Sequence, residues 1–189
     1  IRARRQTQGR GRSGRSWEMP DGNLAATLLF APGAELKSLP GLAIVAGVAV
    51  HDTVAGLLPS AAPVRLKWPN DVLIGTAKVS GMLIETSAFG AGVVAAVGIG
   101  INVAAAPAIA GRDATALADH LTGWRQTPGD EGLDGSQPVG LVSDTPHGTA
   151  FPALGRLDPA DVLVALADRM AYWLAVWSRG AAFSSVREA

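Results

Sequence analysis

Residues 6–17 read Gln-Thr-Gln-Gly-Arg-Gly-Arg-Ser-Gly-Arg-Ser-Trp, and this stretch decides how the fold of the chain is interpreted. It contains the spacing G-x-G-x-x-G at Gly9, Gly11 and Gly14. A dinucleotide-binding fold needs a helix directly after these glycines, so that the helix N-terminus faces a pyrophosphate. A turn sequence over residues 19–22 follows instead, and the chain contains no Gly-Lys pair of a P-loop. We therefore exclude both of these nucleotide-binding folds.

The same stretch is interpreted as a flexible glycine loop that carries Arg10, Arg12 and Arg15. Backbone N–H groups and guanidinium forks in such a loop both donate hydrogen bonds to anions. Its flexibility fits a lid that becomes ordered over a bound ligand. Two alternatives stay open, an Arg-Gly tract that binds RNA and a loop without a function. The balance of 16 basic and 16 acidic residues weighs against RNA binding.

The composition is typical of one globular domain, with 189 residues of which 48% are apolar and 17% charged. Cysteine is absent, which excludes disulfides, thiolate zinc sites and thiol catalysis. The most apolar stretch, residues 39–50, is shorter than the ~20 residues of a membrane span. The arginines near the start do not resemble a signal peptide. We expect a cytoplasmic protein that makes no contact with a membrane.

Apolar runs separated by turn residues predict an α+β fold with an antiparallel arrangement of strands in the middle of the chain. An apolar stretch over residues 42–58 predicts a buried helix. Asp158 is expected to cap a second helix that starts at Pro159. Residues 122–157, rich in glycine and proline, are expected to form a long loop insertion. Strands are predicted over residues 24–30, 64–68, 72–74, 78–86 and 93–103, the last being the longest.

Two further segments carry polar residues that are candidates for a binding site. Residues 67–71 read Lys-Trp-Pro-Asn-Asp, and Lys78 follows seven residues after Asp71. Taken singly, such a lysine is ordinarily a solvated surface residue, and such an aspartate is as often a turn acceptor as a metal ligand. In residues 98–102, period two places Gly98, Gly100 and Asn102 on one face of a strand. This pattern indicates a flat groove, although a bulge or close helix packing explains the glycines equally well.

Together, these segments resemble the catalytic domain of biotin protein ligases. The family pattern is Q-x-x-G-R-G-R-x-G-R-x-W, G-N-L, K-W-P-N-D, K-h-x-G-h-L-h-E and G-x-G-I-N, which this chain matches at residues 6–17, 22–24, 67–71, 78–85 and 98–102. The resemblance is dense over residues 3–121. It implies a central mixed, largely antiparallel sheet with helices packed on one side, as in lipoate ligases and class II synthetases. It also implies that residues 1–189 form one catalytic domain whose N-terminal part is missing.

The resemblance implies an ATP-dependent ligase that activates biotin as biotinyl-5'-adenylate. Biotin then passes to a lysine of a biotin carboxyl carrier protein, in acetyl-CoA carboxylase or another biotin-dependent carboxylase. ATP and biotin are the implied substrates, with Mg²⁺, and a homodimer is compatible with the family. Lys78 and Arg10 are the implied catalytic residues, and Asp71 is the candidate metal ligand. The implied contacts with biotin or the adenylate are Gln6, Gly9, Arg10, Gly11, Arg12, Arg15, Trp17, Asn70, Lys78, Gly81, Gly100 and Asn102.

Elementary chemistry agrees with these roles. Two anions must meet in the first step, so positive groups such as Lys78 must neutralise both of them. A lid that carries Arg10 and Arg12 would keep water from the reactive anhydride.

The chain also departs from the family pattern. The Ser-Thr-Asn segment that holds the biotin ring system would precede Ile1. Gln8 replaces a small residue, and Ser13 replaces a frequent arginine. A DNA-binding domain and the small C-terminal β-domain are not found in this chain, so a repressor role has no support. The alternatives are a lipoate–protein ligase-like enzyme and a non-catalytic ligand-binding module of the same fold.

Overall fold

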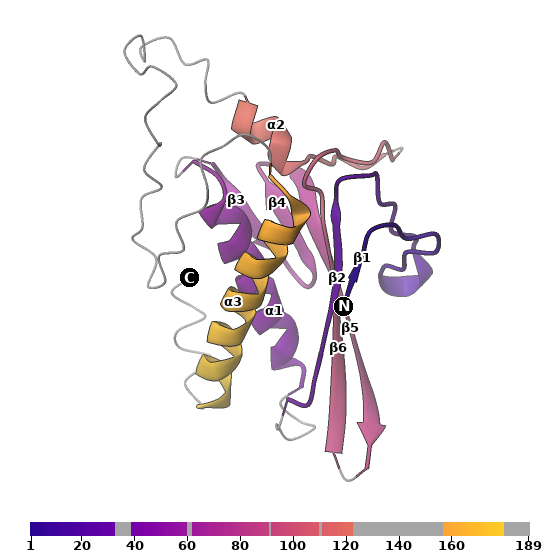
Figure 1. The fold of residues 1–189 in the computed structure, drawn as a ribbon, viewed down its shortest axis with the longest axis vertical. Helices are drawn as coiled ribbons and strands as arrows, with labels where there is room; N and C mark the ends of the chain where they lie inside the picture. Colours follow the sequence, from indigo (N-terminus) through magenta and orange to yellow (C-terminus); the bar gives the residue numbers. More distant parts are fainter. Residues whose placement is uncertain (33–38, 60–61, 91, 110, 123–156, 180–189) are drawn as a thin grey trace.

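The computed structural model describes residues 1–32, 39–59, 62–90, 92–109, 111–122 and 157–179. Within these residues the chain forms one sheet, three α-helices and a single 3-10 turn, η1 (Arg12–Gly14) (Figure 1). The helices are α1 (Gly41–Gly56), α2 (Leu117–Thr122) and α3 (Pro159–Ser178). The strands are β1 (Arg2–Ala3), β2 (Leu24–Phe30), β3 (Val64–Lys67), β4 (Asp71–Ile74), β5 (Ala77–Phe89) and β6 (Gly92–Ile101).

The sheet has the strand order β1-β2-β6-β5-β4-β3, and all five pairings between these strands are antiparallel. Short turns connect β3 through β6, since sequential antiparallel strands pair through tight hairpins. At the β4–β5 turn Gly75 has φ +61, which a glycine adopts without steric cost. The predicted α+β fold with a largely antiparallel sheet is thereby confirmed.

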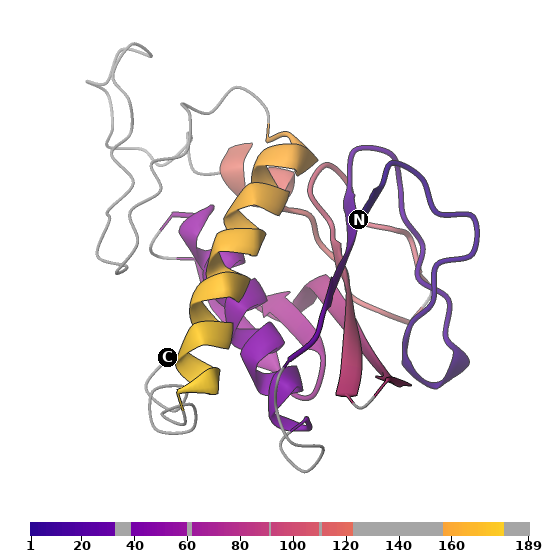
Figure 2. The same ribbon diagram turned by 60° about the horizontal axis from the view of Figure 1, so that its bottom comes forward.

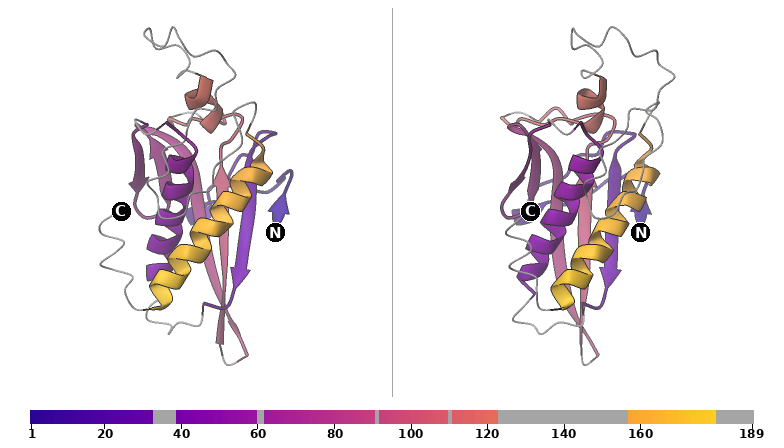
Figure 3. Two further views of the ribbon diagram at one scale, coloured as in Figure 1. Left: turned by 60° about the vertical axis from the view of Figure 1, so that its left-hand side comes forward. Right: turned by 90° about the vertical axis from the view of Figure 1, so that its left-hand side faces the viewer.

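Helices α1 and α3 pack against each other on one face of the sheet (Figure 3). Helix α1 is apolar on nearly all sides because the sheet covers one side and α3 covers another. Trp173 and Trp177 of α3 are buried in the core between the layers, as their helical spacing predicts. Asp158 caps α3 by accepting a hydrogen bond from the Ala160 N–H at 2.7 Å, which confirms the predicted cap.

The opposite face of the sheet is covered by the N-terminal segment around η1, so the two helices and this segment lie on different sides (Figure 2). Strand β6 shows how the faces differ. Its core-facing residues are Ala95, Val97, Ile99 and Ile101, which are buried among apolar side chains. The residues between them are Ala96, Gly98 and Gly100, whose small size leaves that face of the sheet open.

Several boundaries differ from the sequence-based predictions. The longest strand is β5 with 13 residues, not β6 with 10, because residues 87–89 continue to pair with β6. Strand β1 and helix α2 were not predicted, since two and six residues are too short to show a periodic pattern. Of the predicted insertion over 122–157, only Thr122 and Leu157 are among the described residues. A helix apolar and long enough to span a bilayer does not occur in the described part of the chain.

Candidate active site

A cavity of about 680 Å³ lies on the face of the sheet that the helices leave free. Four segments enclose it. Residues 6–17, called the lid from here on, lie over it, and strands β2, β5 and β6 form its floor. The turn between β3 and β4 forms one wall, and residues 103–115, called the wall loop, contribute another. These segments are far apart in the sequence, so the cavity exists only once the sheet has formed.

The lid is a compact hairpin. The Trp17 N–H donates to the Gly9 carbonyl at 2.9 Å, and the Gly11 N–H donates to the Arg15 carbonyl at 2.7 Å. At its tip Ser13 has φ +57, in the left-handed region that few residues other than glycine adopt. Gly9 is required for the closure, because a Cβ there would lie 2.3 Å from the Trp17 carbonyl oxygen. The glycines of the motif thus serve a tight turn rather than a helix N-terminus.

Trp17 lies directly on the floor of the cavity. Gly81 and Gly100 are paired across β5 and β6, and the indole lies over both of them. A Cβ on Gly100 would lie 2.4 Å from two indole carbons, and one on Gly81 would lie 3.0 Å from a third. The groove that the glycines predict is therefore present, and the Trp17 indole occupies part of it. The Trp17 Nε1–H is buried and has no hydrogen-bond partner among the described residues.

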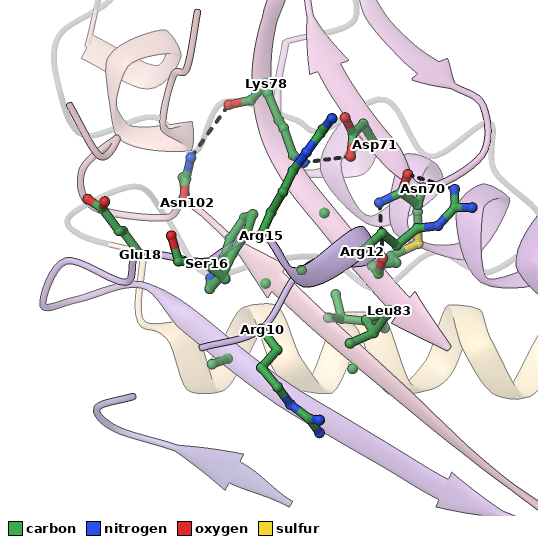
Figure 4. A pocket seen from close by; sticks show the side chains of 18 of the residues that line it. Arg10, Arg12, Arg15, Ser16, Glu18, Asn70, Asp71, Lys78, Leu83 and Asn102 are labelled. Carbon is green, nitrogen blue, oxygen red and sulfur yellow. Dashed lines mark hydrogen bonds and ion pairs between the residues drawn. The ribbon is translucent and has the colours of Figure 1, made fainter. Parts of the chain in front are cut away.

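Lys78 points into the cavity, as Figure 4 shows. It lies beside the Trp17 indole. Its Nζ lies 2.5 Å from Asp71 Oδ1 and 5.5 Å from the centroid of the Trp17 ring. Its side chain is only 30% exposed. The expectation of a solvated surface lysine is thus wrong, because Asp71 and Trp17 hold the ammonium group at the floor.

A β-bulge determines the direction of Lys78. Ser80 lies opposite Val72 and Lys78 lies opposite Leu73, so Val79 is an extra residue on β5. Val79 and Ser80 are both buried, and Lys78 shares the cavity face with Gly81. Bulges often redirect side chains near active sites in this way.

Asp71 has a different setting from the one expected of a metal ligand. Its Oδ1 accepts the hydrogen bond from the Lys78 ammonium group. Among the described residues, no group of three histidine, aspartate or glutamate side chains is placed to hold a metal ion. The carboxylate is therefore a partner of Lys78 first, and any contribution to a metal would compete with that ion pair.

The three lid arginines extend in different directions (Figure 4). Arg12 donates to Asn70 Oδ1 at 3.4 Å, and Arg10 lies 3.4 Å from Glu85 Oε2. Within the described residues Arg15 has no acidic partner. Six cationic and four acidic residues line the cavity in a chain whose formal net charge is zero. The excess positive charge suits a ligand with anionic groups.

Asn102 lies at the end of the floor, where β6 leads into the wall loop. It is 2% exposed, and its Nδ2 donates to the Thr115 carbonyl at 3.0 Å. Its Oδ1 is buried and has no partner within the described part of the chain. Buried polar atoms are normally satisfied, so the Asn102 oxygen and the Trp17 N–H are an acceptor and a donor available to a ligand.

The structure brings together nearly all the site residues that the sequence predicts. The residues that line the cavity are Gln6, Arg10, Gly11, Arg12, Arg15, Trp17, Asn70, Asp71, Lys78, Gly81, Gly100 and Asn102. Gly9 belongs to the lid but does not line the cavity, and it contributes through its tight turn. The wall-loop residues Pro107, Ile109 and Arg112 also line the cavity, and no sequence pattern predicts them. They lie in a loop without periodicity, and only the tertiary fold brings them to the site.

Comparison with known proteins places this arrangement in context. Residues 1–102 match the model of the biotin/lipoate A/B protein ligase family. A biotin–acetyl-CoA-carboxylase ligase from Paracoccus denitrificans is 39% identical over 176 residues, which cover 93% of this chain and 62% of that protein. A relative of the same name from Mycobacterium tuberculosis is 38% identical over 123 residues, covering 62% of this chain and 44% of that protein. The chain thus spans less than two thirds of these relatives.

Solved structures agree with the fold. The biotin protein ligase from Aquifex aeolicus, solved in complex with biotin and ATP, is 30% identical with a TM-score of 0.64. The similarity covers 93% of this chain and 60% of that one. The biotin protein ligase from Leishmania major, solved with biotinyl-5-AMP, has a TM-score of 0.70 over 99% of this chain and 68% of that one. Its identity of 24% supports the fold alone.

Proposed function

Because the chain belongs to the biotin/lipoate A/B protein ligase family, we propose that it activates biotin with ATP and transfers it to a carrier protein. In the first step the biotin carboxylate attacks the α-phosphorus of ATP, which forms biotinyl-5'-adenylate and releases pyrophosphate. In the second step a lysine amine of a biotin carboxyl carrier protein attacks the mixed anhydride. An amide forms, and AMP leaves.

The position of Lys78 carries this proposal. Its ammonium group lies at the floor of the cavity beside Trp17, with Arg10 and Arg12 on the lid above. A carboxylate and a phosphate repel each other, and a fixed ammonium group between them lowers that repulsion most when charge develops in the transition state. Asp71 holds the ammonium in place before the anions arrive. Lys78 and Arg10 are therefore assigned the catalytic roles.

The two ends of the cavity differ in chemistry, which orients the substrates. On one side of Lys78 the floor consists of small and apolar residues, Thr27, Leu83, Ala96 and Gly98. This side suits the uncharged ring system of biotin. On the other side, the buried and unpaired acceptor of Asn102 and the wall loop with Arg112 suit a nucleotide. The reacting groups then meet at Lys78.

The lid has a chemical purpose in this scheme. A mixed anhydride hydrolyses in open water, so the site must exclude water between the two steps. The hairpin of residues 9–17 covers the floor, and its arginines reach Asn70 in the β3–β4 turn and Glu85 on β5. We assign to this segment the role of a lid that becomes fully ordered over the bound adenylate.

Mg²⁺ enters this scheme as part of the MgATP substrate. Magnesium in such sites keeps several waters and is held largely by phosphate oxygens. Asp71 is the nearest carboxylate to Lys78, but the ion pair already uses its Oδ1. We assign no step to the metal.

The proposed acceptor is a biotin carboxyl carrier protein. The proposed location is the cytoplasm. Relatives that are named biotin ligases, with 38% and 39% identity, favour biotin over lipoate as the substrate. A homodimer stays a prediction.

The experiment is biotin-dependent exchange of labelled pyrophosphate into ATP by the natural protein, since the first step is reversible. We expect exchange with biotin and none with lipoate. Lys78→Ala should slow the exchange by about 10²-fold, the scale of losing one fixed electrostatic group. Arg65→Ala, which removes an exposed charge outside the cavity, should change it less than about twofold.

Each result has a defined meaning. Biotin binding without exchange would identify a non-catalytic module of the same fold. Exchange with lipoate alone would identify a lipoate ligase. An unchanged rate in Lys78→Ala would remove that residue from the mechanism.

A further inference from the structure

A buried amide outside the cavity makes an unusual set of hydrogen bonds. Asn23 directly precedes β2 and is 4% exposed. Its Oδ1 accepts from three successive backbone N–H groups, those of Val103 at 2.9 Å, Ala104 at 3.0 Å and Ala105 at 3.2 Å. Its Nδ2 donates to the Ala105 carbonyl at 2.7 Å. One side chain thus fixes three consecutive residues about 80 positions away in the sequence.

These three residues form the start of the wall loop. The other end of that loop is held against β5, where the Lys78 N–H donates to the Asp113 carbonyl at 2.9 Å. The Thr115 N–H donates back to the Lys78 carbonyl at 3.0 Å. The wall loop is therefore anchored at both ends, and its middle carries Pro107, Ile109 and Arg112 to the cavity.

Close packing makes the first anchor rigid. Gly22, with φ +85, lies against the wall loop, since a Cβ there would lie 2.7 Å from the Ala104 Cβ. Without the Asn23 amide, the buried Val103 N–H and the part-buried N–H groups of Ala104 and Ala105 would lose their acceptor. A buried donor without an acceptor is unfavourable, so the start of the wall loop would move until the Val103 N–H finds another partner.

We propose that Asn23 is a positioning residue for the nucleotide, because it fixes the start of the wall loop and thereby the cavity wall beside Asn102. The proposal rests on the proposed function, which places ATP at this end of the cavity. The biotin end of the floor lies on β2, β5 and β6 and is held by strand pairing that does not involve Asn23. Loss of the Asn23 amide therefore weakens ATP binding and leaves biotin binding intact.

The test compares KM for ATP with KM for biotin in the natural protein. Asn23→Ala removes all four hydrogen bonds and should raise KM for ATP about tenfold or more, since small displacements in a site cost that much. KM for biotin should change less than about twofold. Asn23→Asp keeps the acceptor for the three N–H groups but places an oxygen against the Ala105 carbonyl, so its KM for ATP should lie between those of the wild type and Asn23→Ala.

A matched control separates positioning from stability. Val54→Ala creates a core cavity between α1 and the sheet, far from the wall loop, and lowers the melting temperature. Assayed well below its melting temperature, it should keep both KM values. The proposal is overturned if the Asn23 variants raise both KM values together or change neither. Should Asn23→Ala fail to fold, Asn23→Asp decides by the same criteria.

Hydrogen exchange of the ligand-free protein tests the anchor without any activity. The amides of Val103, Ala104 and Ala105 should be protected in the wild type and exchange at least tenfold faster in Asn23→Ala, relative to Val54→Ala. Asn23→Asp keeps the acceptor, so its exchange rates should lie between those of the wild type and Asn23→Ala. Equal exchange would overturn the anchor itself. If the Asn23 variant loses amide protection but the wild type shows no biotin-dependent pyrophosphate exchange, the anchor is supported and the proposed function is rejected.

Discussion

The indole of Trp17 shows how single residues shape this site. It lies on two paired glycines, Gly81 and Gly100, at distances that leave no space for a side chain on the second. The Lys78 ammonium group lies 5.5 Å from the centroid of the same ring, within the range of a cation–π contact. The glycines, the indole and the ammonium group thus form one stack, in which each component needs the others in place.

This stack predicts the effect of adding one methyl group. Gly100→Ala should displace the Trp17 indole, because the new Cβ would lie 2.4 Å from ring carbons. The indole N–H signal of Trp17 should shift in NMR spectra, and formation of the adenylate should slow by about tenfold or more. Gly98→Ala, on the same face of β6, is the control for the spectrum, since its Cβ meets only ordinary contacts from 3.4 Å. A Trp17 signal that is unchanged in Gly100→Ala would contradict the packing described.

At the scale of elements, the lid is a tight hairpin that packs on the sheet through Trp17 but makes few hydrogen bonds beyond its own turns. Its turns are closed by backbone hydrogen bonds, and the side-chain bonds that reach the sheet are the long ones of Arg10 and Arg12. Such a segment is expected at the low end of local stability, where opening costs little. Anionic ligands would add charge-assisted hydrogen bonds to the same arginines.

Hydrogen exchange of residues 9–15 should therefore slow when biotin and ATP are both bound. Gly9→Ala should abolish most of this protection, since a Cβ at 2.3 Å from the Trp17 carbonyl oxygen prevents the hairpin from closing. Gly56→Ala is the matched control, because a Cβ there meets nothing within 4 Å. Exchange that is equal with and without both ligands would contradict the role of a lid.

At the scale of the whole molecule, stability and chemistry lie on opposite faces of the sheet (Figure 2). The helix layer carries its own polar link, in which the Trp173 Nε1–H donates to Asp52 Oδ2 at 2.7 Å between α3 and α1. The nearby His51 Nδ1 lies 3.1 Å from the other oxygen of that carboxylate. None of these three residues lines the cavity.

Trp173→Phe should lower the free energy of unfolding by about 1–2 kcal/mol, because it leaves a half-buried carboxylate oxygen with one partner fewer. The pyrophosphate exchange rate should stay within about twofold of the wild type at temperatures where both proteins are folded. Trp68→Phe serves as the comparison for stability, since its side chain is 62% exposed and its loss should change unfolding little. Denaturant titrations of both variants measure the change in the free energy of unfolding. A fall in the pyrophosphate exchange rate of Trp173→Phe that matches its loss of stability would show that the two faces are coupled.

Local patterns determined much of this architecture without any structure. Strand β2 has the bounds that its apolar run predicts, and α1 follows from an apolar stretch too long for a strand. The resemblance carried by the three polar motifs, rather than their residue types taken singly, implied the residues that meet at the cavity. These features depend on neighbours in sequence, where the period of a strand or helix applies directly.

The tertiary structure alone decided how those residues face one another. Strict alternation places Lys78 and Gly81 on opposite faces of β5, and the extra residue Val79 brings them to the same face. The pairing of Lys78 with Asp71 and the anchoring of the wall loop by Asn23 both require the strand order of the folded sheet. The physical reason is the distance along the chain over which each interaction acts. A periodic pattern records which side of its own element a residue occupies, whereas a bulge or a contact across 80 residues is selected by the packing of the whole sheet.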